Sequence, residues 1–369
     1  MKGLLKYLSP FAPDQSGAVS VLYELGGIIV ICDAGGCTGN ICGFDEPRWF
    51  EKKSALFSAG LRDMDAILGR DDRLVEKLDD AARHLDAKFI ALVGTPVPAV
   101  IATDFRALKR MAEKKTGLPV ITLECTGTHL YDRGASDAYL SLFQTFAKKD
   151  TKKDPHAVGV LGVNPLDVSM THGDRILRKK LNDEGYARVY CYGMDSDSEK
   201  TGEKGSGSPA LAMVEQAGSV AKNIVIAPSG MRTAEYLQKT YGTPYETAYP
   251  LLSEEFRRRL RSLAGKRVLI VHQQIAANEI RREIAADSAE NREKIVCGTW
   301  FMQVPELKKT QDVTFEREEE FVSFVKNGAF DAIVADARFR RALRGWKGEF
   351  AECPHFAVSG TLTEEDGIL

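Results

Sequence analysis

Short runs of apolar, β-branched residues alternate along the chain with longer segments in which apolar positions recur at helical spacing. The run Gly27–Cys32 is continuously apolar and ends at Asp33, which is typical of a strand buried on both faces of a parallel sheet. Similar runs occupy residues 88–94 and 118–123, and residues 61–85 between them keep helical spacing. This alternation predicts βαβ units and a parallel sheet.

The same alternation starts twice more, which divides the chain. A charged stretch at residues 147–155 ends at a proline and separates the first series from the second, and another boundary lies near Leu252 and Ser253. A low-complexity stretch at residues 195–209 is expected to be a flexible loop. Further strands are expected at residues 157–161, 187–191, 223–227, 267–272, 294–297, 331–336 and 355–359, and further helices at 105–115, 232–241 and 254–264. We therefore predict an α/β protein of three Rossmann-like domains, each a mainly parallel sheet flanked by helices, at residues 1–152, 153–252 and 253–369.

Charge and composition exclude several classes of protein. Fifty Lys and Arg against 52 Asp and Glu give a formal net charge of −2, which argues against binding nucleic acid or a membrane surface by bulk charge. No apolar run approaches the roughly 18 residues that a membrane span needs. The apolar stretch at the start is broken by Pro10 and Pro13 and does not resemble a signal peptide. We expect a cytoplasmic, reducing setting, in which seven cysteines are not a disulfide framework.

Phosphate-binding motifs are missing from the sequence. No G-x-x-x-x-G-K-[ST] loop occurs, and no G-x-G-x-x-G follows a predicted strand. The three Rossmann-like units therefore show no nucleotide site of their own.

The candidate chemistry lies in a glycine-rich segment that follows the first strand. Cys32, Cys37 and Cys42 fall within eleven residues, at a spacing that fits no zinc ribbon because it contains no C-x₂-C pair. Iron–sulfur clusters use about four thiolates, and Cys125 follows another predicted strand on the same rim of the sheet. The alternative is that free cysteines are core residues, and this interpretation suits Cys32, which ends a strand, as well as ligation does. His129, near Cys125, is a candidate proton donor or ligand, although a lone loop histidine commonly has neither role.

Several segments together resemble the nitrogenase component 1 family. The resemblance lies in the order and spacing of Pro10–Phe11, Ser16–Ala18, Asp33–Cys37, Phe57–Gly60, Ala91–Pro96, Ile101–Asp104, Leu118–Gly134, Asn223–Ala227 and Tyr241–Tyr245. It implies three Rossmann-like domains and a homodimer, or a heterodimer with a paralogous component 1 subunit. It also implies an iron–sulfur cluster, 4Fe–4S or larger, held between chains by first-domain cysteines. Electrons would come from a separate ATP-hydrolysing iron protein, in line with the missing phosphate loop.

The chain departs from the family at the cluster ligands. Cys37 matches the middle of the three usual cysteines, whereas Pro13 and Pro96 occupy the positions of the other two. The resemblance therefore implies an altered ligand set of Cys32, Cys37, Cys42 and Cys125, with Asp14 or Asp33 as a further candidate because one family branch uses an aspartate. Gly36 and Thr126 would border the cluster.

The function expected from this resemblance is that of the cluster-bearing catalytic component of a two-component, nitrogenase-like reductase. His129 and Asp132 would supply protons to the substrate. The position of the cysteine that anchors the catalytic cofactor of nitrogenase holds Ile226, which argues against dinitrogen reduction. The alternatives are a scaffold or carrier in iron–sulfur or metallocofactor assembly, and a degenerate protein that binds a small metabolite.

Overall fold

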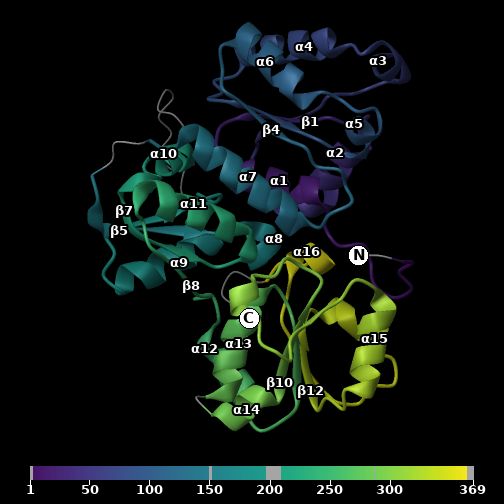
Figure 1. Ribbon diagram of the computed structural model, residues 1–369, viewed down its shortest axis with the longest axis vertical. Coiled ribbons are helices and arrows are strands. Elements are labelled where there is room, and N and C mark those ends of the chain that lie inside the picture. The colour runs from purple at the N-terminus through teal and green to yellow at the C-terminus, as the bar shows by residue number, and fades with distance from the viewer. Residues whose placement is uncertain (1–2, 149–151, 197–208, 287, 364–369) are drawn as a thin grey trace.

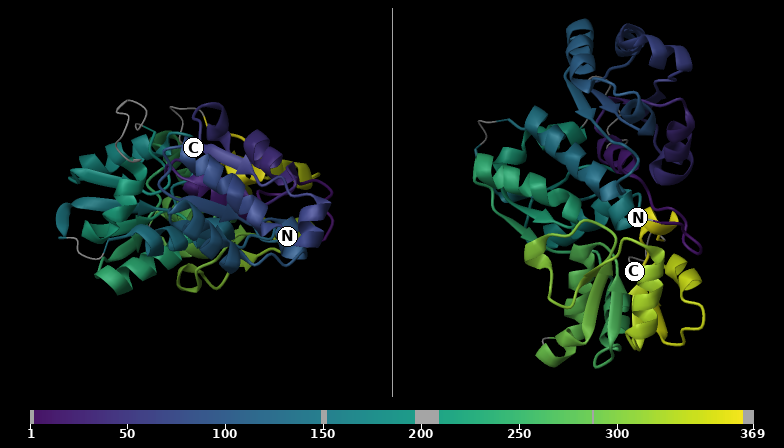
Figure 2. Two further views of the ribbon diagram at one scale, coloured as in Figure 1. Left: turned by 90° about the horizontal axis from the view of Figure 1, so that it is seen from above. Right: turned by 45° about the vertical axis from the view of Figure 1, so that its right-hand side comes forward.

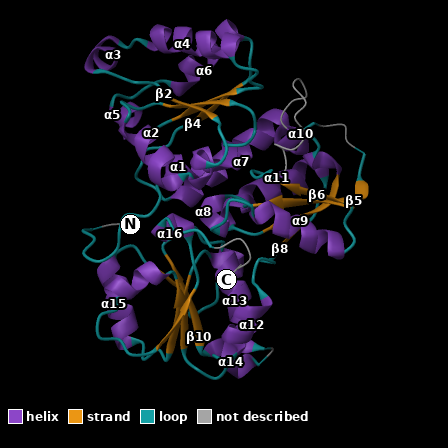
Figure 3. Ribbon diagram, turned by 180° about the vertical axis from the view of Figure 1, so that it is seen from behind, coloured by secondary structure: helices purple, strands orange, loops and turns teal. Residues whose placement is uncertain are grey.

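The computed structural model of the chain describes residues 3–148, 152–196, 209–286 and 288–363. In this part of the chain the strands form three separate sheets, and every pair of neighbouring strands within them is parallel. The sheets lie in three lobes, and helices flank each of them (Figures 1 and 3). The predicted class of three Rossmann-like units is confirmed, whereas the residues at which the domains divide stay predictions. Among the described residues, no helix combines the length and apolar character that crossing a membrane requires.

The first sheet has the order β2-β1-β3-β4 and carries the cysteine-rich segment. Its strands are β1 (Ile28–Ile31), β2 (Ala55–Ser58), β3 (Ile90–Val93) and β4 (Val120–Leu123). Its helices are α1 (Asp14–Leu22), α2 (Gly36–Asn40), α3 (Asp63–Leu68), α4 (Asp71–His84), α5 (Pro96–Val100), α6 (Phe105–Thr116) and α7 (Tyr131–Phe146). A π-helical turn over Ile41–Asp45 continues α2, and a 3₁₀ turn follows at Pro47–Phe50.

The second sheet has the order β6-β5-β7-β8. Its strands are β5 (Asp154–Leu161), β6 (Arg188–Cys191), β7 (Val220–Val225) and β8 (Tyr245–Thr247). Its helices are α8 (Pro165–Val168), α9 (Gly173–Asp183), α10 (Pro209–Glu215) and α11 (Met231–Tyr241). Of the flexible loop predicted over 195–209, residues 197–208 lie outside the described residues.

The third sheet has the order β11-β10-β9-β12-β13. Its strands are β9 (Val268–Val271), β10 (Ile295–Thr299), β11 (Val313–Thr314), β12 (Ala332–Ala335) and β13 (Glu349–Glu352). Its helices are α12 (Glu254–Arg261), α13 (Gln274–Ala285), α14 (Ala289–Glu293), α15 (Glu318–Asn327) and α16 (Phe356–Ser359).

The strand predicted at residues 355–359 is wrong. The structure forms α16 over most of this segment, and Gly360 ends the helix in a left-handed conformation with φ of 66°. The last strand is β13, an edge strand whose first and last residues, Glu349 and Glu352, are exposed, so it lacks a continuous apolar run.

The two faces of the first sheet pack against different helices. Alternate residues of β1 point to opposite sides, so Ile29 and Ile31 join the core formed with α1 and α7. Ile28, Val30 and, just beyond the strand, Cys32 join the core formed with α4 and α6. This alternation places Cys32 on the opposite face of the sheet from the core that Cys37, Cys42 and Cys125 contact.

Helices α1 and α7 touch backbone to backbone at two glycines. A Cβ atom on Gly17 would lie 1.8 Å from the Tyr131 carbonyl oxygen, and one on Gly134 would lie 1.8 Å from the Asp14 carbonyl oxygen. Only glycine permits this approach. The contact holds the start of α1 beside the start of α7, where the loop from β4 arrives.

An N-terminal segment, residues 6–13, joins the first domain to the third, and we call it the N-terminal strap. The carboxylate of Glu318, at the start of α15, accepts hydrogen bonds from the backbone N–H groups of Lys6, Tyr7 and Leu8. Phe11 packs edge-on against Trp300, with ring centroids 5.6 Å apart. The strap therefore lies against the C-terminal elements before the chain enters α1 (Figures 1 and 2).

Candidate functional site

Two of the predicted thiol ligands lie on one short helical segment after β1. Cys37 is in α2 and Cys42 is in the π-helical turn that continues it, and both side chains are partly buried against the core beneath α1 and α7. Burial, followed by the charge of nearby carboxylates, raises the pKa of both thiols above the ordinary value. Around them, a Cβ atom built on Gly36, Gly39 or Gly43 would meet nothing within 4 Å. The glycine-rich segment therefore borders open space. Gly36, the predicted cofactor-binding residue, is one of the glycines that face this space.

Asp33 holds this segment in place. Its carboxylate accepts hydrogen bonds from the Thr38 backbone N–H at 2.8 Å, the Thr38 hydroxyl at 3.0 Å and the Ser58 hydroxyl at 2.6 Å. The three bonds tie the first turn of α2 to the ends of β1 and β2. Asp33 is thus occupied by the protein itself, and its role is to position Cys37 rather than to offer a free ligand.

Replacing Asp33 by asparagine is expected to lower the free energy of unfolding by about 1–3 kcal/mol, because an amide NH₂ cannot accept from all three donors. The same change should speed the reaction of Cys37 with a thiol reagent, since the helical segment loses its anchor. Urea unfolding and thiol titration measure the two effects. Asp72→Asn, on the exposed first turn of α4, is the matched control. An unchanged rate of thiol reaction would contradict the anchoring role.

The loop after β4 carries Cys125 and Thr126 and is held by Asp14. The Asp14 carboxylate accepts from the backbone N–H groups of Thr126 at 3.0 Å and Gly127 at 2.9 Å. Cys125 is buried in the core beneath α1 and α7, and this burial raises its pKa. Thr126 is only partly buried, and its hydroxyl lies 2.6 Å from that of Thr128. Asp14, like Asp33, therefore organises a loop that bears a cysteine.

The structure does not bring Cys32 together with the other three candidates. Its side chain packs in the core beneath α4 and α6, on the opposite face of the sheet from the core that includes Cys37, Cys42 and Cys125. Burial, reinforced by Asp33, raises the pKa of the Cys32 thiol to about 12. Among the residues that the structure describes, no three His, Cys, Asp or Glu side chains form a group that could hold a metal ion.

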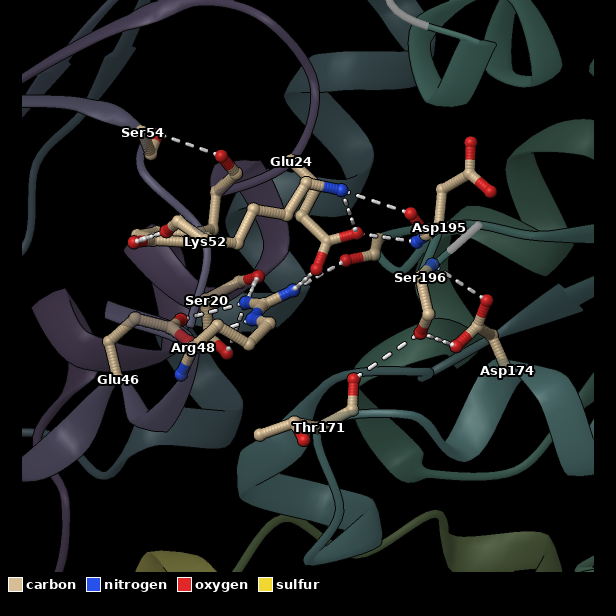
Figure 4. Close-up of polar contacts among 12 residues, drawn as sticks. Ser20, Glu24, Glu46, Arg48, Lys52, Ser54, Thr171, Asp174, Asp195 and Ser196 are labelled. Carbon is tan, nitrogen blue, oxygen red and sulfur yellow. Dashed lines mark hydrogen bonds and ion pairs between the residues drawn. The ribbon is translucent and has the colours of Figure 1, made fainter. Parts of the chain in front are cut away.

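A fully buried arginine supports the segment that follows Cys42. Arg48 donates from Nε to Glu46 at 2.7 Å, from Nη1 to Glu24 at 3.2 Å, and from Nη2 to the Ser20 carbonyl oxygen at 2.6 Å (Figure 4). Nη1 also donates to the carbonyl oxygen of Gly193 in the second domain, at 3.1 Å. Burial lowers the pKa of Arg48, but the two carboxylates outweigh this effect and raise it. The network joins the cysteine-bearing turn to α1 and to the second domain.

The two predicted proton donors occupy different environments. His129 is exposed, and its carbonyl oxygen accepts from the Asp14 backbone N–H at 3.0 Å. Asp132 lies in the first turn of α7, where its carboxylate accepts from the backbone N–H groups of Arg133 and of Met302 in the third domain. Burial raises the pKa of Asp132 to about 6. A carboxyl group with this pKa can exchange a proton near neutral pH.

A buried polar cluster at the meeting point of the three domains was not identified from the sequence. The Tyr131 hydroxyl, from α7, lies 2.7 Å from the Asp167 carboxylate in the second domain and 2.9 Å from Nε2 of His355 in the third. His355 stacks on His272, with ring centroids 4.3 Å apart. Asp167, His272 and His355 all follow carboxyl ends of strands, which was the available signal.

Burial shifts the pKa of each ionisable group in this cluster toward the neutral form. The pKa of Asp167 rises to about 7, and that of His272 falls to about 4. The pKa of His355 also falls because of burial and the neighbouring His272. Asp167 is therefore partly protonated at neutral pH, and the Tyr131 hydroxyl, whose pKa is raised by burial, donates to it.

Comparisons with known proteins agree with this architecture. The model of the nitrogenase component 1 type oxidoreductase family matches residues 15–296. Two solved structures of "Nitrogenase Cp1", at pH 6.5 and at pH 5, superpose with TM-scores of 0.70 and 0.66 at 12% and 13% identity. They cover 95% and 98% of this chain, and 87% and 86% of the matched chains. The chain is thus a protein of three α/β domains, each built on a parallel sheet, like the nitrogenase chains it superposes on.

The chain belongs to the nitrogenase component 1 type oxidoreductase family, as the match to most of its length shows. It is also 26% identical over 191 residues to the nitrogenase iron-molybdenum cofactor biosynthesis protein NifE of Clostridium pasteurianum. That match covers 51% of this chain but only 38% of the curated relative.

Proposed function

We propose that this chain is the cluster-bearing component of a two-component, nitrogenase-like reductase that receives electrons from an ATP-hydrolysing iron protein. The observation that carries the proposal is the pair of partly exposed thiols, Cys37 and Cys42, on one helical segment beside open space. Thiolates are the ligands of iron–sulfur clusters, and two from one chain are half of a four-thiolate set. A second chain would supply the rest, and Cys125 lies in the same core as a further candidate.

The residues present fit such a shared group. Asp33 and Asp14 hold the backbones of the two cysteine-bearing segments, a Cβ atom on Gly36 would meet nothing within 4 Å, and Thr126 carries a hydroxyl on the loop after β4. A bound iron–sulfur cluster supplies one-electron transfer. Around it, the chain's own residues would hold the ligands, limit water and, at Asp132, hold a proton.

A protein partner is further supported by apolar side chains on the same rim of the first sheet. Ile67 in α3 is 74% exposed and Val100 in α5 is 84% exposed. These helices and the cysteine-bearing segment all follow carboxyl ends of strands, so they share one edge of the sheet. Exposed apolar side chains that gather at one edge of a sheet are candidates for an interaction site. We propose that a second copy of this chain, or a paralogous component 1 subunit, covers this rim.

The test is anaerobic purification followed by iron and sulfide analysis and EPR. The wild-type protein should carry about four irons per cluster, and Cys37→Ala and Cys42→Ala should each lose most of this iron. Cys32→Ala should keep it because Cys32 lies on the other face of the sheet, and Cys353→Ala, in the core of the third domain, is the control for thiol loss alone. A wild-type protein without iron, or equal iron in all four variants, would overturn the proposal.

A second candidate is a scaffold or carrier in metallocofactor assembly, which the match to the cofactor biosynthesis protein NifE favours. The two candidates share ligands but differ in turnover. A reductase should show ATP-dependent reduction of its cluster by an iron protein, measured by EPR. A scaffold should transfer iron to an apo-acceptor without ATP.

A further inference from the structure

A pocket between the first and third domains lies next to the cysteine-bearing segment. It encloses about 600 Å³, within the range of ligand sites. One wall is formed by Gly43–Asp45, directly after Cys42, and another by Phe356–Gly360 and Arg338 of the third domain. Residues 9–13 of the N-terminal strap form the remaining side.

The third-domain wall is held rigidly by Asp336, at the end of β12. Its carboxylate accepts from the Arg338 backbone N–H at 2.8 Å, the His355 backbone N–H at 2.9 Å and the Ser359 hydroxyl at 2.7 Å. The strap pairs with the same wall through the Ala12 backbone N–H, which donates to Ala357. A site with fixed walls loses little freedom when a ligand binds.

Arg338 is the charged group of this wall, and most of its donors are unused. Its guanidinium makes one hydrogen bond, from Nη2 to the Ser359 carbonyl oxygen at 2.8 Å. Among the described residues, the other N–H donors of this guanidinium have no acceptor and no carboxylate pairs with it. The Arg338 side chain is partly buried, so its guanidinium is partly desolvated, and no carboxylate in the described part of the chain compensates its charge. An anion in the pocket would restore that charge balance.

The opposite wall offers an acceptor and an apolar surface. The Asp45 carboxylate accepts from the Ser16 hydroxyl and the Asn40 side chain, both at 2.7 Å and both on Oδ2. Among the described residues, its other oxygen, Oδ1, makes no hydrogen bond. Phe44, which is 73% exposed, lines the same wall as Asp45, and Phe356 lines the wall that carries Arg338.

We propose that this pocket binds a small organic anion, whose carboxylate or phosphate group pairs with Arg338 and whose apolar body lies against Phe44 and Phe356. Binding itself does not depend on a metal cluster. The ligand's role as the substrate rests on the proposed function, because Gly43–Asp45 place it beside the cysteine-bearing turn.

The test uses two dyes that differ by one charge, 8-anilinonaphthalene-1-sulfonate and the uncharged N-phenyl-1-naphthylamine, titrated by fluorescence against the full chain. Arg338→Gln should weaken binding of the sulfonate about tenfold, the loss of one charge-assisted pair, and leave the uncharged dye unchanged. Arg338→Lys, which keeps the positive charge, should lose less affinity for the sulfonate dye than Arg338→Gln. Arg341→Gln, an exposed arginine on the same 3₁₀ helix, is the matched control and should change neither dye.

Competitors identify the anionic group. Benzoate and phenyl phosphate should displace the sulfonate dye from the wild-type protein, and the stronger of the two names the group that Arg338 prefers. Failure of both to displace it, or equal losses in the Arg338 and Arg341 variants, overturns the proposal. Iron content separates this result from the proposed function: Arg338→Gln should keep its iron, and Cys37→Ala should keep its dye binding.

Discussion

Replacing Arg48 by methionine is expected to lower the free energy of unfolding by about 3–5 kcal/mol, because the change leaves Glu24 and Glu46 buried without their shared cation. Both carboxylates and the guanidinium are almost wholly inaccessible to water. The methionine would fill the space of the arginine stem but could not donate to the Ser20 and Gly193 carbonyl oxygens.

Urea unfolding at pH 7 measures this loss, with Arg133→Met as the control. Arg133 pairs with Asp137 at 3.3 Å on the exposed side of α7, and such a pair contributes below about 1 kcal/mol. Replacing Arg48, Glu24 and Glu46 together by apolar residues should recover part of the stability, since the guanidinium and both carboxylates are then gone and Lys52, which also pairs with Glu24, is 20% exposed to water. A single-variant loss below 1 kcal/mol would show that water reaches this network.

The free energy of unfolding of Asp167→Asn is expected to rise relative to that of the wild type as the pH rises from 5 to 8. The Asp167 carboxyl has a raised pKa of about 7, so it stays protonated in the folded protein while the unfolded chain ionises near pH 4. Stability from this group is therefore fully present below about pH 4 and is lost as the pH rises from about 4 to about 7. Asparagine resembles the protonated acid and removes the loss, which amounts to about 3 kcal/mol between pH 5 and 8.

The histidines of the same cluster change stability with pH in the opposite direction, and they are present in both the wild type and the Asp167→Asn variant. Burial lowers the pKa of His272 to about 4, so its contribution is lost as the pH falls below about 6.5. Urea unfolding of wild type and variant at both pH values isolates the Asp167 contribution. Asp174→Asn is the control: this buried carboxylate lies 3.6 Å from Arg178 and accepts from Ser196, so its loss should destabilise the protein at pH 8. A difference between Asp167→Asn and wild type that does not change with pH would contradict the assignment.

The fold was largely predictable because strands buried on both faces form continuous apolar runs. Strands β1, β3, β4 and β9 lie within the runs predicted for them. Edge strands such as β2 and β13 were missed or misplaced because each contains exposed residues, which break the apolar run.

The candidate site was predictable only where neighbours along the chain are neighbours in space. Cys37 and Cys42 share one helical segment, whereas Cys32 faces the other side of the sheet. A run that is apolar on both faces does not reveal which face meets which helix. The Tyr131, Asp167 and His355 cluster depends on the relative placement of three domains, and Arg48 depends on a partner 145 residues away. The positions of Asp167 and His355 after strand ends hint at a site, but no local pattern shows that these residues meet.

The N-terminal strap makes complete folding wait for the end of synthesis. Leu8 donates its backbone N–H to a residue 310 positions later, Glu318. A ribosome adding roughly 5–20 residues per second needs about 15–60 seconds to cover that distance, during which domains generally fold from the N-terminus onward. Phe11 and the strap's backbone donors therefore stay without their partners while the first two domains form. During this interval the unpaired strap is accessible to a chaperone and to other nascent chains.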